Sequence, residues 1–191
     1  MPQLIQTSEA DFPPELRRQA LELSYLEWPQ AFSAPPKGDE ALNDPALDPV
    51  CIALVEDGCL LSYTGVQSLW FGKGDEVCRV SGISGMLTRA AQRGRGAGRQ
   101  VLVAASAWMA RSGTDFGIFT CDPPLVAFYA RAGWIETPTM PLVGGTREQP
   151  FPSAQFGKVT LAQAFTPRGQ ARLVQQQGRP IELELGVGNL W

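Results

Sequence analysis

The sequence has no histidine among its 191 residues. Ser-His-Asp and Cys-His catalysis, the HExxH zinc site and the histidine-containing deaminase site each need an imidazole as base or ligand. These classes are therefore excluded. Acid–base chemistry in this chain must use carboxylates, tyrosine, cysteine, lysine, a chain terminus or water.

Cysteines are few, and long apolar runs and excess basic charge are absent. The four cysteines form no CxxC pair, so we expect reduced, mostly buried thiols and no metal site. No stretch approaches the about 18 apolar residues of a spanning helix, and the N-terminus lacks a basic region followed by an apolar one. A net charge of −3 disfavours nucleic-acid or anionic membrane partners. We predict a soluble, cytoplasmic protein.

What the sequence does contain is a hydrophobic content of 44%, enough for a core that buries roughly 70% of the unfolded surface. We expect one domain over residues 1–191. Alternating and helical patterns predict a strand at 4–5, a helix over 15–28 and a surface loop over 33–49. Hairpin-like strands follow at 50–56, 59–69 and 76–88, which makes the front half antiparallel.

The back half alternates helices and strands. Helical spacing is found over 99–111, and Pro123-Pro124 fits the first turn of a helix that runs to about residue 132. The strands are expected at 116–120, 158–165 and 181–185, with a helix between the last two. A proline- and glycine-rich stretch lies at 137–157. This pattern predicts a mixed α/β domain.

A glycine-rich segment opens the helix at 99–111. Small residues let a backbone approach a ligand, and the unpaired N–H groups at a helix start suit a diphosphate. A Walker A loop is disfavoured because the segment ends Gly98-Arg99-Gln100 rather than in Gly-Lys-Ser/Thr. A dinucleotide fingerprint needs a parallel βαβ unit, and an RGG-like segment needs repeats with interleaved aromatic residues. Neither pattern is present.

Two motifs together resemble the GNAT acetyltransferase superfamily. Arg93-x-x-Gly96-x-Gly98 is similar to that family's Arg/Gln-x-x-Gly-x-Gly/Ala signature, and Phe128-Tyr129-Ala130-Arg131-Ala132-Gly133-Trp134 looks like its Phe-Tyr-x-x-x-Gly-Phe/Trp element. The resemblance implies an α/β (α+β) fold with a mixed, mostly antiparallel central sheet, a splayed strand pair and flanking helices. It also implies a coenzyme-binding core at about 76–134 and a strand-containing extension at about 135–191.

Within the superfamily, the layout is most similar to that of aminoglycoside 2'-N-acetyltransferases. The features are the strand pair at 52–69, the turn before Arg79, the string at 130–134 and the ending Gly188-Asn189-Leu190-Trp191. Those enzymes have two carboxylates on the acceptor side. This chain has uncharged residues, Ser84 and Asn189, at the matching positions, so both negative charges are absent. The resemblance therefore implies a different, less cationic acceptor, which efficient 2'-acetylation of gentamicin-like substrates would refute.

The resemblance implies a coenzyme site built mainly from backbone. The end of the strand before the glycine segment would pair with the pantetheine arm and direct one N–H at the thioester oxygen. Such a donor stabilises charge that grows in the transition state, an effect of about 3 to 4 kcal/mol. The predicted coenzyme-binding residues are Met86, Leu87, Thr88, Arg93, Gly94, Arg95, Gly96, Ala97, Gly98 and Arg99.

By the same resemblance, Tyr129 would protonate the departing thiolate, although a purely packing role stays open. The acceptor ammonium, with a pKa of about 10, must lose a proton before attack. Asp122 is one candidate base, but it also fits a helix cap. The terminal carboxylate of Trp191 is another, and Glu27 is a third that also fits a solvated helix face. Glu27, Trp28, Ser84 and Trp191 are the predicted acceptor-binding residues.

These expectations describe an N-acetyltransferase that moves acetyl from acetyl-CoA to a small-molecule amine by direct attack in a ternary complex. Cys121 as a nucleophile is disfavoured because it has no visible activating base. The alternative is a non-catalytic acyl-CoA-binding or sensor domain of the same fold. A homodimer stays open.

Overall fold

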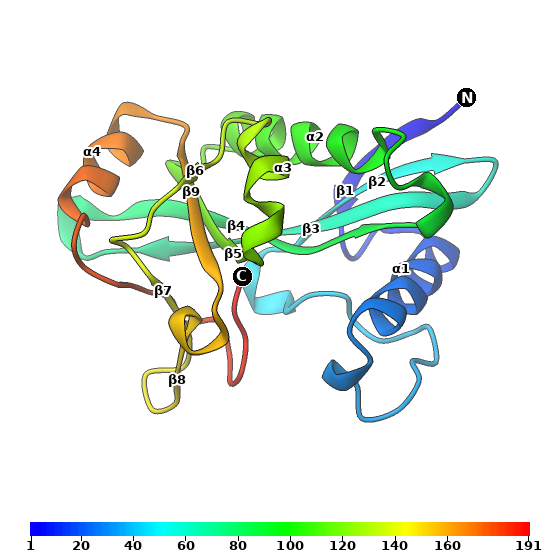
Figure 1. The fold of residues 1–191 in the computed structure, drawn as a ribbon, viewed down its shortest axis with the longest axis horizontal. Coiled ribbons are helices and arrows are strands. Elements are labelled where there is room, and N and C mark those ends of the chain that lie inside the picture. The colour runs from blue at the N-terminus through cyan, green and yellow to red at the C-terminus, as the bar shows by residue number, and fades with distance from the viewer. The chain divides into compact units, whose positions relative to one another are not determined.

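A computed structural model describes residues 1–191 and divides into two compact units (Figure 1). The first unit comprises residues 1–67 and 83–105, and the second comprises 68–82 and 106–191. Three elements contribute to both units: strands β3 (Cys59–Phe71) and β4 (Cys78–Thr88) and helix α2 (Ala97–Arg111). None of the helices combines the length and the apolar character that a bilayer span requires.

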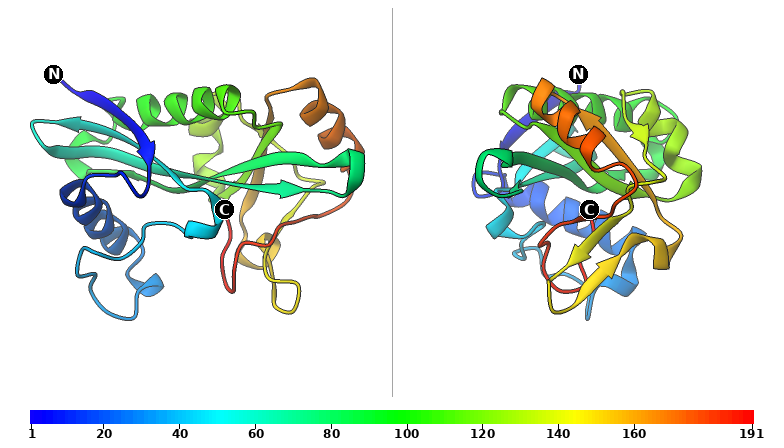
Figure 2. Two further views of the ribbon diagram at one scale, coloured as in Figure 1. Left: turned by 180° about the vertical axis from the view of Figure 1, so that it is seen from behind. Right: turned by 90° about the vertical axis from the view of Figure 1, so that its left-hand side faces the viewer.

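The first unit is built on antiparallel strands. β1 (Gln3–Ser8) pairs with β2 (Val50–Glu56), which pairs in turn with β3. Asp57 and Gly58 join β2 to β3 with φ of 50° and 74°, as a tight hairpin turn requires. Helix α1 (Pro14–Glu27) covers one face of these strands, and the first half of α2 lies on the other (Figure 1, Figure 2). The predicted hairpin and both helices are confirmed.

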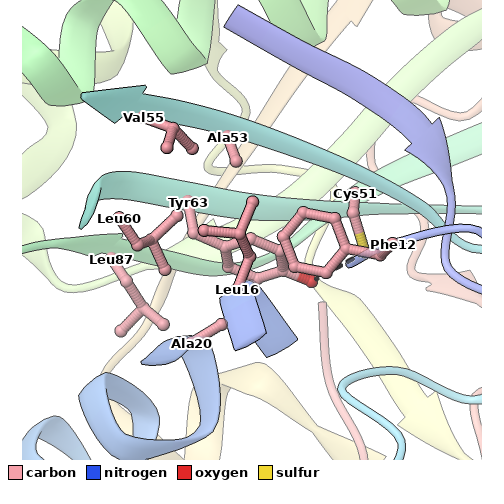
Figure 3. Packing of buried hydrophobic residues seen from close by; sticks show 9 residues of the cluster. All are labelled: Phe12, Leu16, Ala20, Cys51, Ala53, Val55, Leu60, Tyr63 and Leu87. Carbon is pink, nitrogen blue, oxygen red and sulfur yellow. Dashed lines mark hydrogen bonds between the residues drawn. The ribbon is translucent and has the colours of Figure 1, made fainter. Parts of the chain in front are cut away.

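The core of this unit lies between α1 and the strands (Figure 3). Leu16 and Ala20 are four residues apart on α1, so they share the face that is buried. The Phe12 and Tyr63 rings pack with centroids 5.8 Å apart. Burial of each large side chain contributes about 1.5 to 3 kcal/mol. The buried cluster comprises Phe12, Leu16, Ala20, Cys51, Ala53, Val55, Leu60, Tyr63 and Leu87.

The predicted surface loop at 33–49 contains a 3-10 turn, η2 (Pro45–Leu47), and is anchored by Asn43. The Asn43 side-chain amide donates to Glu9 Oε2 at 2.8 Å and to the Tyr63 hydroxyl at 3.0 Å. A Cβ at Gly65 would collide with this amide, so glycine is required there. Asn43 is buried, which ties an otherwise exposed loop to the core.

The second unit contains the remaining strands. β5 (Phe116–Cys121) pairs antiparallel with β9 (Val159–Ala164), and β6 (Ile135–Glu136) pairs with the other edge of β9. The order of the seven-stranded sheet is β1-β2-β3-β4-β5-β9-β6. A separate sheet has the order β10-β7-β8, formed by β10 (Ile181–Glu182), β7 (Leu142–Gly145) and β8 (Pro150–Pro152). The mixed, mostly antiparallel α/β fold is thus confirmed.

The parallel pairing of β4 with β5 is short. It joins Val80 to Phe116 and Ser81 to Gly117, whereas β4 continues to Thr88 and β5 to Cys121. Gly85 interrupts β4 with a φ of 64°, a conformation that inside a strand is typical of a bulge. The ladder between the two strands therefore comprises these two residue pairs.

The structure differs from the sequence prediction in the stretch 137–157. No element was assigned to this proline- and glycine-rich stretch, and it holds β7, β8 and the 3-10 turn η6 (Ser153–Phe156). The predicted helix at 123–132 is shorter, because a 3-10 turn, η5 (Pro123–Leu125), precedes α3 (Val126–Ala130). The predicted helix near 167–178 is α4 (Pro167–Gln175).

Candidate functional site

The glycine-rich segment is a tight bend between β4 and α2. A 3-10 turn, η4 (Ala90–Gln92), leads into turn residues 93–96, and α2 begins at Ala97. Gly94 and Gly96 have φ of 75° and 87°, which side chains with a Cβ rarely adopt. The backbone N–H groups of Arg93 and Arg95 donate to carbonyl groups of the preceding turn at 3.2 and 3.3 Å. These internal bonds fix the bend.

Five other N–H groups of the bend have no acceptor within the chain; they belong to Gly94, Gly96, Ala97, Gly98 and Arg99. The first bond of the helix is donated by Gln100 to the Gly96 carbonyl at 3.1 Å. A Cβ at Gly94 or Gly96 would meet no atom within 4 Å, so the space beside the bend is open. Unpaired donors at the positive end of a helix form a site for a phosphate or diphosphate.

The three arginines of the bend differ in their partners. The Arg93 side chain donates from Nε to the Thr88 carbonyl at 3.1 Å and from Nη2 to Glu27 Oε2 at 2.7 Å. Arg95 and Arg99 are exposed and have no ion-pair partner in the chain. Of the three, only the guanidinium groups of Arg95 and Arg99 are therefore without a partner in the chain.

The end of β4 is fixed by β3 and by the core. The Leu87 side chain belongs to the buried cluster, and its carbonyl accepts a hydrogen bond from the Ser62 hydroxyl at 2.7 Å. The Thr88 hydroxyl lies 2.9 Å from that of Ser62. Met86, Leu87 and Thr88 therefore form a rigid strand end directly before the bend.

Three predicted acceptor-side residues also belong to the first unit. Glu27, at the end of α1, is ion-paired with Arg93. Trp28 packs against the buried cluster, and its ring carbon Cζ3 lies 4.0 Å from the position that a Cβ of Gly85 in β4 would take. Ser84 is partly buried, and its carbonyl accepts from Thr64 Oγ1 at 3.3 Å. The structure thus places Glu27 and Trp28 against β4 and the bend.

Tyr129 is the buried aromatic residue of α3. Its ring packs against Phe119 and Phe128 with centroids 4.8 and 5.0 Å away, while its hydroxyl has no hydrogen-bond partner in the chain. Burial raises the pKa of Tyr129 above its ordinary value, and Cys121 and Asp122 add to this effect. The hydroxyl is therefore protonated at neutral pH and has a proton to donate.

Asp122 follows β5 and is exposed. It occupies the cap position of η5 but makes no side-chain cap hydrogen bond, so the helix-cap interpretation of its carboxylate is wrong. The carboxylate instead pairs with Lys158 at 2.6 Å. The neighbouring Cys121 is buried, and desolvation raises its pKa to about 11. A thiol with that pKa is protonated at neutral pH and is a poor nucleophile.

Trp191 is buried within the second unit. Its carbonyl oxygen accepts hydrogen bonds from the Thr120 N–H at 2.6 Å and from the Thr120 hydroxyl at 2.5 Å. The indole lies against Gly82 so closely that a Cβ at this position would collide with it. The segment that leads to Trp191 runs beside β7 (Figure 2), where the Asn189 carbonyl accepts from the Gly145 N–H at 2.9 Å.

Sequence reasoning missed the partners of several site residues. Arg93 and Glu27 are 66 positions apart, and no local pattern links them. Thr120 donates to Trp191 and Gly82 lies against its indole, but neither residue belongs to a sequence motif that would have predicted this. The one available signal was a glycine inside a strand pattern at Gly82, which often marks the close approach of another group. No group of three or more histidine, cysteine, aspartate or glutamate side chains is arranged to hold a metal ion.

Comparisons with known proteins bear on the fold and the family of this chain. No curated protein sequence matches the chain. Among solved structures, an acyl-CoA N-acyltransferase from Pseudomonas aeruginosa is similar with a TM-score of 0.58 at 18% identity, covering 86% of this chain and 100% of that one. Escherichia coli ElaA is similar with a TM-score of 0.59 at 16% identity, covering 85% and 99%.

A third similar structure is an aminoglycoside 6'-N-acetyltransferase complexed with coenzyme A, with a TM-score of 0.55 at 13% identity over 85% of this chain and 98% of that one. At these identities the likeness concerns the fold alone. The family model described as the acetyltransferase (GNAT) family matches residues 10–134. Since this match spans more than half of the 191 residues, the chain belongs to the GNAT acetyltransferase family.

Proposed function

We propose that this protein transfers an acetyl group from acetyl-CoA to the amine of a small molecule by direct attack in a ternary complex. The observation that carries the proposal is the set of five unpaired N–H groups at residues 94 and 96–99, which suits the coenzyme's diphosphate. Bound there, acetyl-CoA would supply an activated thioester. The single-domain organisation over 1–191, with a coenzyme-binding core at about 76–134, is part of the same proposal.

The chain's own residues would act on the two ends of the reaction. Backbone N–H groups of Met86, Leu87 and Thr88 would hold the pantetheine arm, and one would stabilise negative charge on the thioester oxygen. Their backbone suits this role because Leu87 and Thr88 are fixed through Ser62. As the amine nitrogen bonds to the carbonyl carbon and the C–S bond breaks, Tyr129 would donate its proton to the sulfur.

On the acceptor side, Asp122 is the proposed carboxylate for taking up the ammonium proton, directly or through water. It is exposed, and its negative charge adds to the raised pKa of Tyr129. Trp28, Ser84 and Trp191 are the proposed acceptor-binding residues. The acceptor itself is proposed to be less cationic than an aminoglycoside.

Thiol release from acetyl-CoA tests this proposal. The purified protein should release free thiol in equal amount to acetylated product with at least one member of a panel of aromatic amines, diamines, amino-acid esters and aminoglycosides. Reactions without amine correct for the protein's own four cysteines. Tight coenzyme binding without turnover on any amine would instead favour the non-catalytic acyl-CoA-binding alternative.

A further inference from the structure

The ion pair between Glu27 and Arg93 joins three chain segments around the coenzyme bend. Glu27 is the last residue of α1, and Arg93 follows η4 directly. The same guanidinium group also donates to the carbonyl of Thr88, the last residue of β4. One side chain therefore connects the end of α1, the end of β4 and the first residue of the bend.

Two hydrogen bonds direct the Arg93 guanidinium group toward Thr88 and Glu27. Its Nε and Nη2 atoms donate at 3.1 and 2.7 Å. Two of the five N–H donors of this group are therefore used within the chain. Arg95 and Arg99 have no partners in the chain and lie next to the unpaired N–H groups. They are the better source of positive charge for a diphosphate.

The neighbour of Glu27 strengthens the same connection. One ring carbon of Trp28, Cζ3, lies 4.0 Å from the position that a Cβ of Gly85 in β4 would take, and the Trp28 backbone N–H closes α1 by donating to the Ser24 carbonyl at 2.8 Å. The end of α1 thus lies near β4 at Gly85 and contacts the bend at Arg93. Loss of the ion pair would remove the contact between α1 and the bend.

We infer that the Glu27–Arg93 pair positions the coenzyme bend, so that Arg93 is a positioning residue rather than a phosphate ligand and Glu27 is not the general base. The inference rests on the proposed coenzyme site. The arginines then have different roles. Arg93 fixes the position of the bend, whereas Arg95 and Arg99 bind the negative charge of the phosphates.

Removal of the Glu27 carboxylate distinguishes a positioning role of Arg93 from a phosphate-binding role. The affinity for desulfo-CoA should fall in the first case and rise in the second. If Arg93 holds the bend, Glu27→Gln should weaken desulfo-CoA binding by about 3-fold, the scale expected for an exposed ion pair. Arg93→Gln should weaken it similarly, and the double variant should be no weaker than either single variant, because both remove one interaction. Tighter or unchanged binding by Glu27→Gln, or additive losses in the double variant, would overturn the inference.

Calorimetry at low salt gives these affinities, with Glu22→Gln as the matched control. Glu22 lies on the same helix and pairs with Arg18, so its loss should leave coenzyme binding unchanged. In turnover, the Glu27 and Arg93 variants should raise the KM for acetyl-CoA and leave kcat within about 2-fold. A kcat loss above about 10-fold in Glu27→Gln would instead assign Glu27 to proton removal.

The wild-type titration separates this inference from the proposed function. Absence of desulfo-CoA binding by the wild type would defeat both, whereas wild-type binding with unaffected variants would defeat only the positioning role. Arg95→Gln and Arg99→Gln should weaken binding and reduce its salt dependence, since each removes a charge that faces phosphate. An unchanged salt dependence in both variants would contradict the assigned division.

Discussion

At the scale of single residues, Tyr129 combines two properties that rarely occur together. It is buried to 5% exposure, yet its hydroxyl has no hydrogen-bond partner in the chain. The hydroxyl oxygen is not among the fully buried side-chain atoms without a partner, so it keeps some exposure and can be reached by a ligand. The hydroxyl is protonated at neutral pH, as a general acid requires, although burial raises the pKa of Tyr129 and so makes it a weaker acid.

Replacement of Tyr129 by phenylalanine should lower kcat by about 100-fold or more, the lower end of the range for general acid catalysis. The KM for acetyl-CoA should change little, because ring packing against Phe119 and Phe128 is retained. Steady-state kinetics with acetyl-CoA and the best acceptor measure both constants. Tyr25→Phe, on α1, is the control and should leave kcat unchanged. An undiminished kcat in Tyr129→Phe would remove this residue from the mechanism.

Gly82 offers a second prediction at the residue scale. A methyl group at this position collides with the Trp191 indole, so Gly82→Ala should destabilise the protein by about 1 to 3 kcal/mol. Denaturant unfolding measures the loss, and intrinsic fluorescence reports the displaced tryptophan. Because the collision needs both partners, the double variant with Trp191→Ala should lose less stability than the two single losses added together. Strict additivity would show that the contact is not the cause.

At the scale of elements, the bend between β4 and α2 depends on glycine backbone geometry. Gly96 and Gly58 both have left-handed φ angles, 87° and 74°, and both have open space where a Cβ would point. Gly58 lies in the β2–β3 turn, whereas Gly96 carries one of the unpaired N–H groups. The two positions therefore match in strain but differ in their proposed role.

Alanine at either position should cost about 1 kcal/mol or somewhat more of unfolding free energy, because each forces a side chain into the left-handed region. Only Gly96→Ala should raise the KM for acetyl-CoA, by about 10-fold, since its methyl group would project into the space beside the N–H groups. Urea unfolding and steady-state kinetics on both variants provide the comparison. Equal KM values in the two variants would separate the bend from coenzyme binding.

The sequence pattern was sufficient to predict elements that are stabilised by residues close in the chain. The hairpin was predictable because Asp57-Gly58 lies between two apolar runs, and the bend because Gly94, Gly96 and Gly98 open a helix. The short strands β6, β7 and β8 were not predictable. They contain only two to four residues each. β6 and β7 pair with the distant strands β9 and β10, and β8 pairs with β7 alone. The Glu27–Arg93 pair escaped detection for the same reason.

At the scale of the whole molecule, a buried thiol and a buried phenol make the free energy of unfolding fall as the pH becomes alkaline. Burial raises the pKa of Cys51 to about 12 and that of the fully buried Tyr63 well above its ordinary value. An unfolded thiol has a pKa of about 8.5. The folded state therefore keeps protons that the unfolded state releases. The contribution to stability is complete below pH 8 and is lost as the pH rises toward 12.

Between pH 8 and pH 10, Cys51 alone should reduce the free energy of unfolding by about 1 to 2 kcal/mol. Urea unfolding at the two pH values measures this loss. Cys51→Ala should be less stable than the wild type at pH 8 because it leaves a small cavity, but its loss toward pH 10 should be smaller by that amount. The same pH dependence in both proteins would contradict the assignment to Cys51.

The central claim is that unpaired backbone N–H groups at residues 94 and 96–99 bind the coenzyme's diphosphate. Selective ¹⁵N labelling of the 20 glycines allows this to be observed directly by NMR during titration with CoA. We expect downfield shifts of the Gly94, Gly96 and Gly98 amide proton signals, while the signals of Gly58 and Gly178 stay in place. Binding of CoA that leaves the three signals unmoved would contradict this claim.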